Sequence, residues 1–147
     1  MVVRRERVVP AAPPEVWRIV SDPTRLAAWW PGVTRVEEAT PDAWTTVLVA
    51  PTGKSVRADY SLVEADEQER LLWRHEVEES PFERLLSDST TEIALEAEGS
   101  GGTLVRVTLH QRPRGWARFS PFQLRAAASR QAEAALEGLA ELLGDGN

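Results

Sequence analysis

Apolar and polar residues follow two different periods along this chain, and the change from one to the other predicts its architecture. From about residue 43 to residue 111 the two kinds of side chain alternate, as they do along a strand with one covered face. Val105, Val107 and Leu109, for example, are separated by Arg106 and Thr108. Over residues 120–143 the apolar positions recur every three or four residues instead. That spacing predicts one long amphipathic helix of about 23 residues.

Signals at both ends of this last segment support the helix. Ser120 is a good N-cap, Pro121 suits the first helical position, and Gln123 completes a capping box. Gly144 suits the residue just after the helix.

The apolar stripe of the helix changes along its length. Alanine and Gln131 make up its first half, and leucines make up its second half. We expect the leucines Leu136, Leu139 and Leu143 to fill a core. Small alanine side chains leave more room against a curved sheet. The pattern therefore predicts a cavity beneath residues 124–131, near Phe122 and the Trp29–Trp30 pair.

The remaining elements are short and are separated by turn residues. Strands are predicted at residues 2–9, 33–39, 43–50, 55–64, 71–77, 87–98 and 103–111. Two short helices are predicted after the first strand, one from near Pro14 to Val20 and one over residues 24–28. Strands joined by short hairpins form an antiparallel sheet, and one long helix can cover its apolar face. This order predicts an α+β fold in a single domain over residues 1–147.

Composition narrows the classes of function. A net charge of −6 argues against a nucleic-acid partner, which usually meets a basic face. The chain has no cysteine, so disulfides and thiolate chemistry are excluded, and with two histidines we expect no metal site. No apolar run approaches 20 residues, and the charged N-terminus lacks a signal core. We therefore expect no membrane insertion, and a cytoplasmic location.

Three short stretches carry a resemblance to a known family. They are Ala12–Trp17 at the first short helix, Asp22–Val33 through the second, and Leu71–Arg74 in a strand. Together with the order of elements they resemble the START-like superfamily, the SRPBCC group related to Bet v 1. The chain looks closest to its polyketide cyclase/dehydrase and coenzyme-Q-binding branch. The resemblance implies a helix-grip fold, in which a curved seven-stranded antiparallel sheet grips the C-terminal helix around a deep apolar cavity.

Individual residues give weaker signals, and each allows a purely structural interpretation. Trp73 and His75 share the apolar face of one strand, so His75 either reaches the cavity or is a packed histidine bonded to backbone. Thr91 either orients a polar ligand group or packs within its strand. Gln131 either enters the cavity or lies at the edge of the helix in water. Asp59 and Glu76 are expected on the outer face, in ion pairs with Arg57 and Arg74.

Aromatic residues complete the predicted site. Trp29, Trp30, Trp44 and Phe122 are the large side chains expected near a cavity mouth, since apolar pockets are usually lined by rings. The predicted ligand-binding residues are Trp30, Trp73, His75, Thr91, Ile93, Phe122, Ala128 and Gln131. No residue is assigned a catalytic role, and His75 and Tyr60 are the candidates for proton transfer. We expect no cofactor.

Three functions are compatible with these residues. The first is binding of a small hydrophobic or amphipathic molecule, such as a lipid, quinone or polyketide-like compound. The second is an enzyme of the polyketide cyclase or aromatase type that uses the same cavity. The third is an interaction module that acts on another protein through Trp116 and the basic residues Arg112, Arg114 and Arg118, and a homodimer is also possible. These basic residues could instead bind an anion or a membrane surface, or form a solvated linker. An enzyme should show histidine or carboxylate groups with shifted pKa values inside the cavity.

Overall fold

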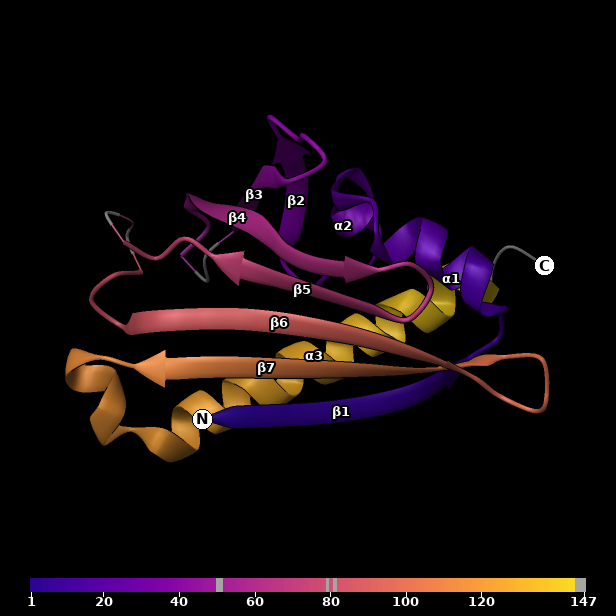
Figure 1. Ribbon diagram of the computed structural model, residues 1–147. Coiled ribbons are helices and arrows are strands. Elements are labelled where there is room, and N and C mark those ends of the chain that lie inside the picture. Colours follow the sequence, from indigo (N-terminus) through magenta and orange to yellow (C-terminus); the bar gives the residue numbers. More distant parts are fainter. Residues whose placement is uncertain (50–51, 79, 81, 145–147) are drawn as a thin grey trace.

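The chain folds into one curved antiparallel sheet and a long helix that crosses it (Figure 1). A computed structural model describes residues 1–49, 52–78, 80 and 82–144, without the side chains of residues 116 and 117. The seven strands lie in the order β1-β7-β6-β5-β4-β3-β2. This arrangement is the helix-grip fold that the sequence predicts, with three short helical segments between the first two strands, where two helices were predicted.

The elements begin and end close to the predicted positions. In chain order they are β1 (Val2–Val9), α1 (Pro13–Val20), η1 (Pro23–Arg25), α2 (Leu26–Trp29), β2 (Val33–Glu37), β3 (Ala43–Val49), β4 (Ser55–Asp66), β5 (Arg70–His75), β6 (Leu86–Ala97), β7 (Thr103–Pro113), η2 (Gly115–Phe119) and α3 (Pro121–Gly144). The predicted strand over 71–77 ends at His75, and Gly144 is the last residue of α3 rather than the residue after it. Ala50, predicted as the end of a strand, lies outside the described residues.

Strand register places the aromatic residues in rows across the sheet. Trp44 of β3 is paired with Tyr60 of β4, and Tyr60 is paired with His75 of β5. In the neighbouring row Trp73 is paired with Thr91 of β6, and Thr91 with Leu109 of β7. Residues opposite one another in adjacent strands point to the same face. Side chains far apart in the sequence are thereby brought to one place on the inner face.

Helix α3 packs on this inner face and is fixed at both its middle and its second half. Arg5 of β1 donates to Glu133 over 3.1 Å and to the hydroxyl of Ser129 over 3.0 Å. Further along, Gly138 lies against the backbone of α2, where a Cβ atom would come within 2.5 Å of the Trp29 carbonyl oxygen. Only glycine allows the helices to approach this closely, so Gly138 sets the position of α3 beside Trp29.

The aliphatic core fills the space under the second half of α3. Leu139 and Ala135 of the helix are fully buried, and so are Ile93 and Val105 of the sheet. These residues belong to a single buried cluster. The prediction that the leucine half of the helix fills the core is confirmed for Leu136 and Leu139, while Leu143 is only half-buried.

The outer face of the sheet is polar and carries cross-strand ion pairs. Arg70 lies 2.6 Å from Glu64 and 2.7 Å from Glu92. Asp59 and Glu76 do face outward, but their predicted arginine partners are wrong. Asp59 accepts a hydrogen bond from Thr45 and Glu76 accepts one from Ser61, because these hydroxyls lie opposite them or in the adjacent strand. Arg57 pairs with Glu37 and Arg74 with Asp88 instead.

Candidate functional site

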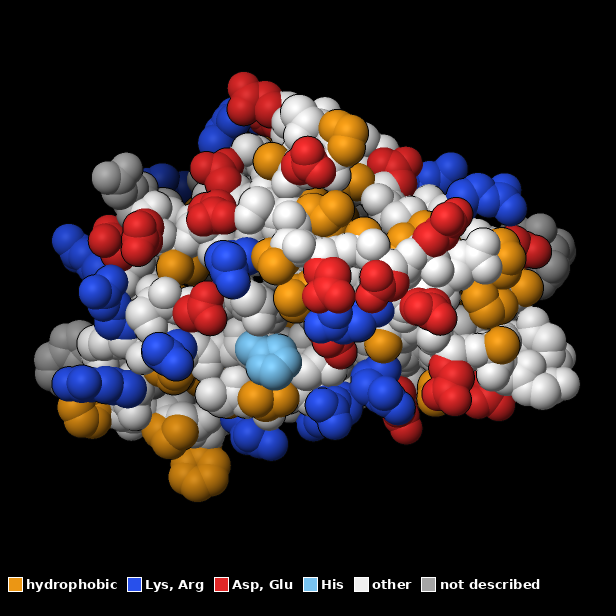
Figure 2. Space-filling view, in the orientation of Figure 1, with side chains coloured by type: hydrophobic (Ala, Val, Ile, Leu, Met, Phe, Trp, Pro, Cys, Tyr) orange, Lys and Arg blue, Asp and Glu red, His pale blue; other side chains and the backbone are white. Residues whose placement is uncertain are grey.

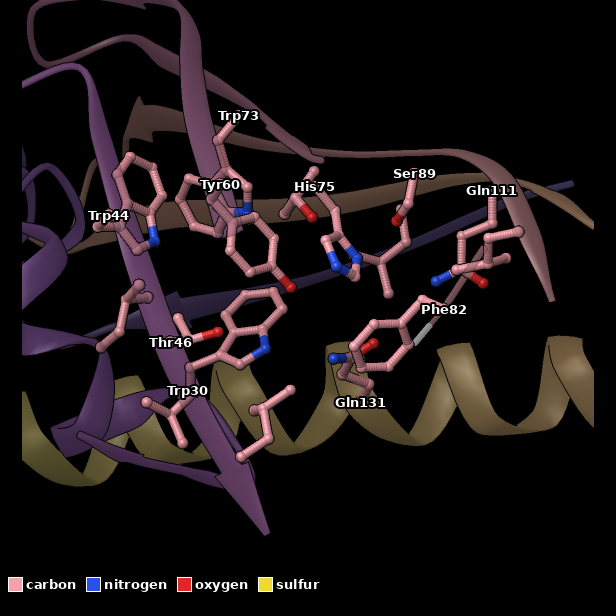
Figure 3. Close-up of a pocket in the computed structure, with 16 residues that line it drawn as sticks. Trp30, Trp44, Thr46, Tyr60, Trp73, His75, Phe82, Ser89, Gln111 and Gln131 are labelled. Carbon is pink, nitrogen blue, oxygen red and sulfur yellow. The ribbon is translucent and has the colours of Figure 1, made fainter. Parts of the chain in front are cut away.

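A cavity of about 200 Å³ lies between the inner face of the sheet and α3 (Figure 3). An engineered cavity of about 150 Å³ is large enough to hold benzene, so this space fits a molecule of one or two rings. Strands β3 to β7 supply most of its wall. The lining residues are Leu26, Trp30, Val33, Trp44, Thr46, Leu48, Tyr60, Trp73, His75, Phe82, Leu86, Ser89, Thr91, Leu109, Gln111 and Gln131.

Among the described residues, the cavity wall holds neutral polar groups and no Asp, Glu, Lys or Arg. Seven of the lining residues have polar side chains, and they are Thr46, Tyr60, His75, Ser89, Thr91, Gln111 and Gln131. Gln131 is the one lining residue from α3, and its amide extends from the helix toward the sheet (Figure 3). A cavity of this kind suits an amphipathic molecule without a formal charge, since none of the lining residues described here would neutralise one.

Six ring contacts join seven aromatic side chains in one continuous series. Trp29 meets Trp30 edge to face with ring centres 5.3 Å apart, and Trp30 meets Trp73 at 5.7 Å. The series continues through Trp44 and Tyr60 to His75 and Phe82. Trp73 lies 5.9 Å from Trp44, Trp44 stacks on Tyr60 at 6.0 Å, and His75 lies 4.8 Å from both Tyr60 and Phe82. Offset and edge contacts at these distances are stabilising, so the rings form a rigid wall.

His75 is held in the neutral form by its surroundings. Its side chain is 6% exposed and stacks on Tyr60 with the ring planes 22° apart. Burial lowers the pKa of His75 below its ordinary value of 6.5, and the carboxylates of Asp59 and Glu76 oppose this shift. Its Nε2 atom is buried without a hydrogen-bond partner among the described residues. The alternative of a histidine satisfied by backbone therefore does not hold for Nε2.

Tyr60 retains its proton at ordinary pH. Burial raises the pKa of Tyr60 to about 12, while a hydrogen bond with Thr46 acts in the opposite direction. Thr46 also donates to the carbonyl of Ala58 in the neighbouring strand, so its hydroxyl is fixed. The cavity wall thus pairs a neutral imidazole with a protonated phenol. A histidine with a shifted pKa inside the cavity is the feature expected of an enzyme, so this pair of groups is compatible with the cyclase alternative as well as with binding.

Two tryptophans also bury an N–H group without a partner among the described residues. These are Nε1 of Trp44, which lines the cavity, and Nε1 of Trp29, which lies behind it. A buried donor left unpaired costs about 1–3 kcal/mol. Unpaired groups of this kind are uncommon in folded proteins, and two of the three found here belong to residues of the cavity wall.

The structure brings together five of the eight predicted ligand-binding residues. Trp30, Trp73, His75, Thr91 and Gln131 all line the cavity. Tyr60, a candidate for proton transfer, lines it as well.

The other three predicted residues do not line the cavity. Phe122 is 87% exposed because the first turn of α3 extends beyond the sheet. Ile93 and Ala128 are 0% and 3% exposed and belong to the packed core. The expected position of the cavity beneath Leu124 is also wrong, because this residue is half-buried and α3 reaches the cavity only at Gln131.

Several lining residues were missed from the sequence. Phe82 lies in the connection between β5 and β6, where the sequence has no regular apolar pattern that would show which way the side chain points. Gln111 could have been found, because it continues the alternation of Val107 and Leu109 to the inner face of β7. The interaction module rested partly on Trp116, whose side chain lies outside the described part of the chain.

Metal clusters and membrane-spanning helices are both absent from the described ranges. No three His, Asp or Glu side chains there are grouped so that they could hold a metal ion. None of the helices described is long and apolar enough to cross a membrane.

Comparison with known families decides the classification of this fold. The family model for polyketide cyclase / dehydrase and lipid transport matches residues 1–144. The chain belongs to this family. Membership supports a ligand-binding or cyclase role for the cavity and leaves the particular ligand open. A search of curated proteins found no match to the sequence.

Solved structures with little sequence identity share the fold of this family member. TTHA0849 from Thermus thermophilus superposes with a TM-score of 0.80 at 24% identity, over 100% of this chain and 99% of that one. A START superfamily protein from Mycobacterium smegmatis gives 0.78 at 14% identity, over 99% of both chains. The di-domain ARO/CYC StfQ from the steffimycin biosynthetic pathway gives 0.77 at 13% identity, over 98% of this chain and 50% of its own.

Proposed function

We propose that this protein binds a small, uncharged, amphipathic molecule in the cavity between the sheet and α3. The observation that carries the proposal is the composition of the cavity wall. Aromatic and aliphatic side chains make up its apolar part, seven side chains are polar and neutral, and none of the described residues that line it is Asp, Glu, Lys or Arg. Compounds of the lipid, quinone or polyketide-like classes have this combination of apolar carbon and a few uncharged oxygens.

Apolar burial would supply most of the affinity in this proposal. A ligand lying against Trp30, Trp73 and Tyr60 removes ring surface from water at about 25 cal/mol per Å². Hydrogen bonds would then orient it. The indole N–H of Trp44 can only donate, while neutral His75 offers Nε2 as a donor or an acceptor according to its tautomer. A ligand with a carbonyl or hydroxyl oxygen would therefore be preferred over a hydrocarbon of equal size.

A matched pair of small molecules tests this proposal. Acetylnaphthalene and ethylnaphthalene have the same two rings and nearly the same shape, but only the first has a carbonyl oxygen. Equilibrium dialysis should show binding of both, with the ketone bound about fivefold more tightly, as expected for one additional hydrogen bond.

Two substitutions on one strand provide the control. Ser89→Phe adds bulk inside the cavity, whereas Thr90→Phe adds the same bulk on the outer face of β6. We expect Ser89→Phe to weaken binding of both compounds at least tenfold and Thr90→Phe to leave it unchanged. Equal loss in the two variants would show that the compounds bind elsewhere and would overturn the proposal.

The cyclase alternative has a separate test in the same cavity. A cyclase requires a base that removes a proton from the carbon next to a carbonyl. Acetylnaphthalene has such protons, and their exchange with deuterated water can be followed by NMR. Binding alone predicts no acceleration by the protein. Acceleration that disappears in His75→Phe, while the ketone still binds, would favour the enzyme.

A further inference from the structure

One end of the molecule exposes aromatic side chains that the cavity does not use. Phe122 is 87% exposed, Phe119 is 69% exposed and Leu85 is 49% exposed. The other large hydrophobic side chains exposed among the described residues are the valines Val2, Val8, Val49 and Val63. The exposed phenylalanines are thus concentrated on a short segment around the start of α3.

Strand pairing and a loop contact bring Leu85 to the same end. Leu86 is paired with Pro113 at the end of β6 and β7. The backbone N–H of Arg114 donates to the carbonyl of Leu85 over 2.8 Å. From there η2 leads directly into α3, at the lower left of Figure 1. Figure 2 shows hydrophobic side chains protruding at this end with Lys and Arg side chains around them.

The same end carries positive charge in an acidic protein. Residues 112–130 include five arginines and no Asp or Glu, although the net charge of the chain is −6. Arg84, Arg112, Arg114, Arg118 and Arg125 are exposed. Ion pairs among the described residues involve other arginines, namely Arg5, Arg35, Arg57, Arg70, Arg74 and Arg106. Glu83 is the one exposed carboxylate in the adjoining turn.

The beginning of α3 extends past the sheet. Among residues 121–127 only Leu124 is half-buried and the others are exposed, and the first buried residue is Ala128. At a rise of about 1.5 Å per residue, Phe122 lies about 13 Å along the helix from Gln131 in the cavity wall. We call this surface the arginine–phenylalanine end. It is formed by Leu85, Phe119, Phe122 and the exposed arginines Arg84, Arg112, Arg114, Arg118 and Arg125.

We propose that the arginine–phenylalanine end binds peripherally to an anionic membrane surface. Exposed phenylalanines can enter the boundary between headgroups and acyl chains, while arginines pair with lipid phosphates. A phospholipid surface satisfies both features, since it offers negative charge above and apolar carbon below. An acidic protein would satisfy the arginines, but the 87% exposed ring of Phe122 also requires apolar surroundings, which the acyl chains of a bilayer supply.

The arginine–phenylalanine end lies next to the cavity, which suggests why membrane binding there would be useful. Leu86 and Gln111 line the cavity, and Gln111 is followed directly by Arg112. A protein bound in this way would hold its cavity close to the lipid phase, where an apolar ligand is concentrated. The proposal does not require the cavity to bind any particular compound.

Vesicle flotation with the full chain tests the proposal. Vesicles of phosphatidylcholine alone are compared with vesicles of equal parts phosphatidylcholine and phosphatidylglycerol. We expect binding to the anionic vesicles, at least about tenfold weaker binding to the neutral ones, and loss of binding in high salt. Phe122→Ser and the double variant R114E/R118E should each weaken anionic binding about tenfold.

Controls of the same chemistry lie elsewhere on the surface. Val63→Ser removes an exposed apolar side chain from β4, and Arg25→Glu reverses an exposed charge in η1. Both should bind vesicles like the wild type. No binding to either vesicle, or equal loss in the controls, would overturn the proposal. So would a Phe122→Ser variant that binds normally, because charge alone would then explain the interaction and a soluble polyanion would serve equally well. Probe binding in the cavity is measured separately, so either proposal can fail alone.

Discussion

The two ends of the space under α3 are built from the same helix and the same strands, yet one is solid and the other is hollow. Under Leu136 and Leu139 the sheet contributes Ile93 and Val105, and these side chains are all at most 3% exposed. Beneath Gln131 the sheet contributes aromatic rings and short polar side chains, and a cavity remains. Flexible aliphatic chains interlock and fill space, whereas rigid rings fixed by one another cannot close a gap. The hollow end is therefore where a ligand can be bound, and the solid end is where the fold gains its stability.

The largest expected effect is on stability, at the solid end. Leu139→Ala should lower the free energy of unfolding by about 3–4 kcal/mol, because it opens a cavity in a filled core. Leu109→Ala should cost only about 2 kcal/mol, since Leu109 already borders empty space and has fewer contacts to lose. Urea unfolding of both variants measures the difference. Equal losses would mean that the two ends are packed alike.

Larger side chains should also destabilise the solid end more than the hollow end. Ala135→Phe places a ring in the solid end and should cost about 2–3 kcal/mol or prevent folding. Ser89→Phe places the same ring in the hollow end and should cost less than about 1 kcal/mol. Thermal unfolding of the two variants decides between these outcomes. If Ser89→Phe is less stable than Ala135→Phe, the cavity does not have room for an additional ring.

The distinction between the two ends was only partly predictable from sequence. The alternation of apolar residues fixed the strands and their inner face, and the three-to-four spacing fixed α3. A cavity is present, but the alanines Ala128, Ala132 and Ala135 do not line it, because they pack in the buried core. The predicted position of the cavity was right at Gln131 and Trp30 and wrong at Leu124 and Phe122, because the sequence does not show how far α3 extends beyond the sheet. For that reason Phe122 was expected in the cavity and is instead exposed.

Strand alternation predicted which side chains face inward, but not which of them line the cavity, since Ile93 of β6 lies in the packed core. Trp73, His75 and Thr91 follow from alternation and from the register of neighbouring strands. Phe82 is placed by a connection with no regular backbone, so its contact with His75 depends on tertiary packing. Unpaired nitrogens such as Nε1 of Trp44 have no sequence signal, because a nitrogen is unpaired only when none of its neighbours in the fold offers a hydrogen-bond acceptor.

A smaller effect is expected from the indole of Trp44. Trp44→Phe removes the unpaired N–H while retaining an aromatic ring against Tyr60. Affinity for acetylnaphthalene should fall about fivefold, and affinity for ethylnaphthalene should not change, because only the ketone can accept a hydrogen bond. Equilibrium dialysis of the two compounds against this variant gives both values. A parallel loss for both would assign Trp44 a purely apolar role.

The smallest expected effect is a dependence of stability on pH that His75 contributes. Burial lowers the pKa of His75 in the folded state below 6.5, so the unfolded chain binds the proton more readily. This contribution to stability is present above pH 6.5 and is lost as the pH falls from 6.5 toward the folded-state pKa. His75→Phe lacks the group and should lack this loss. Melting temperatures of both proteins, compared from about pH 8 to about pH 5, show whether wild type falls more steeply.

The most direct measurement of the central claim is native mass spectrometry of protein purified from its own host. Wild type and the Thr90→Phe control should carry the same small uncharged compound, and Ser89→Phe should carry none. Release and identification of that compound would then name the ligand class. A wild-type protein that is reproducibly empty, or a compound that remains on Ser89→Phe, would contradict the claim that this cavity is the binding site.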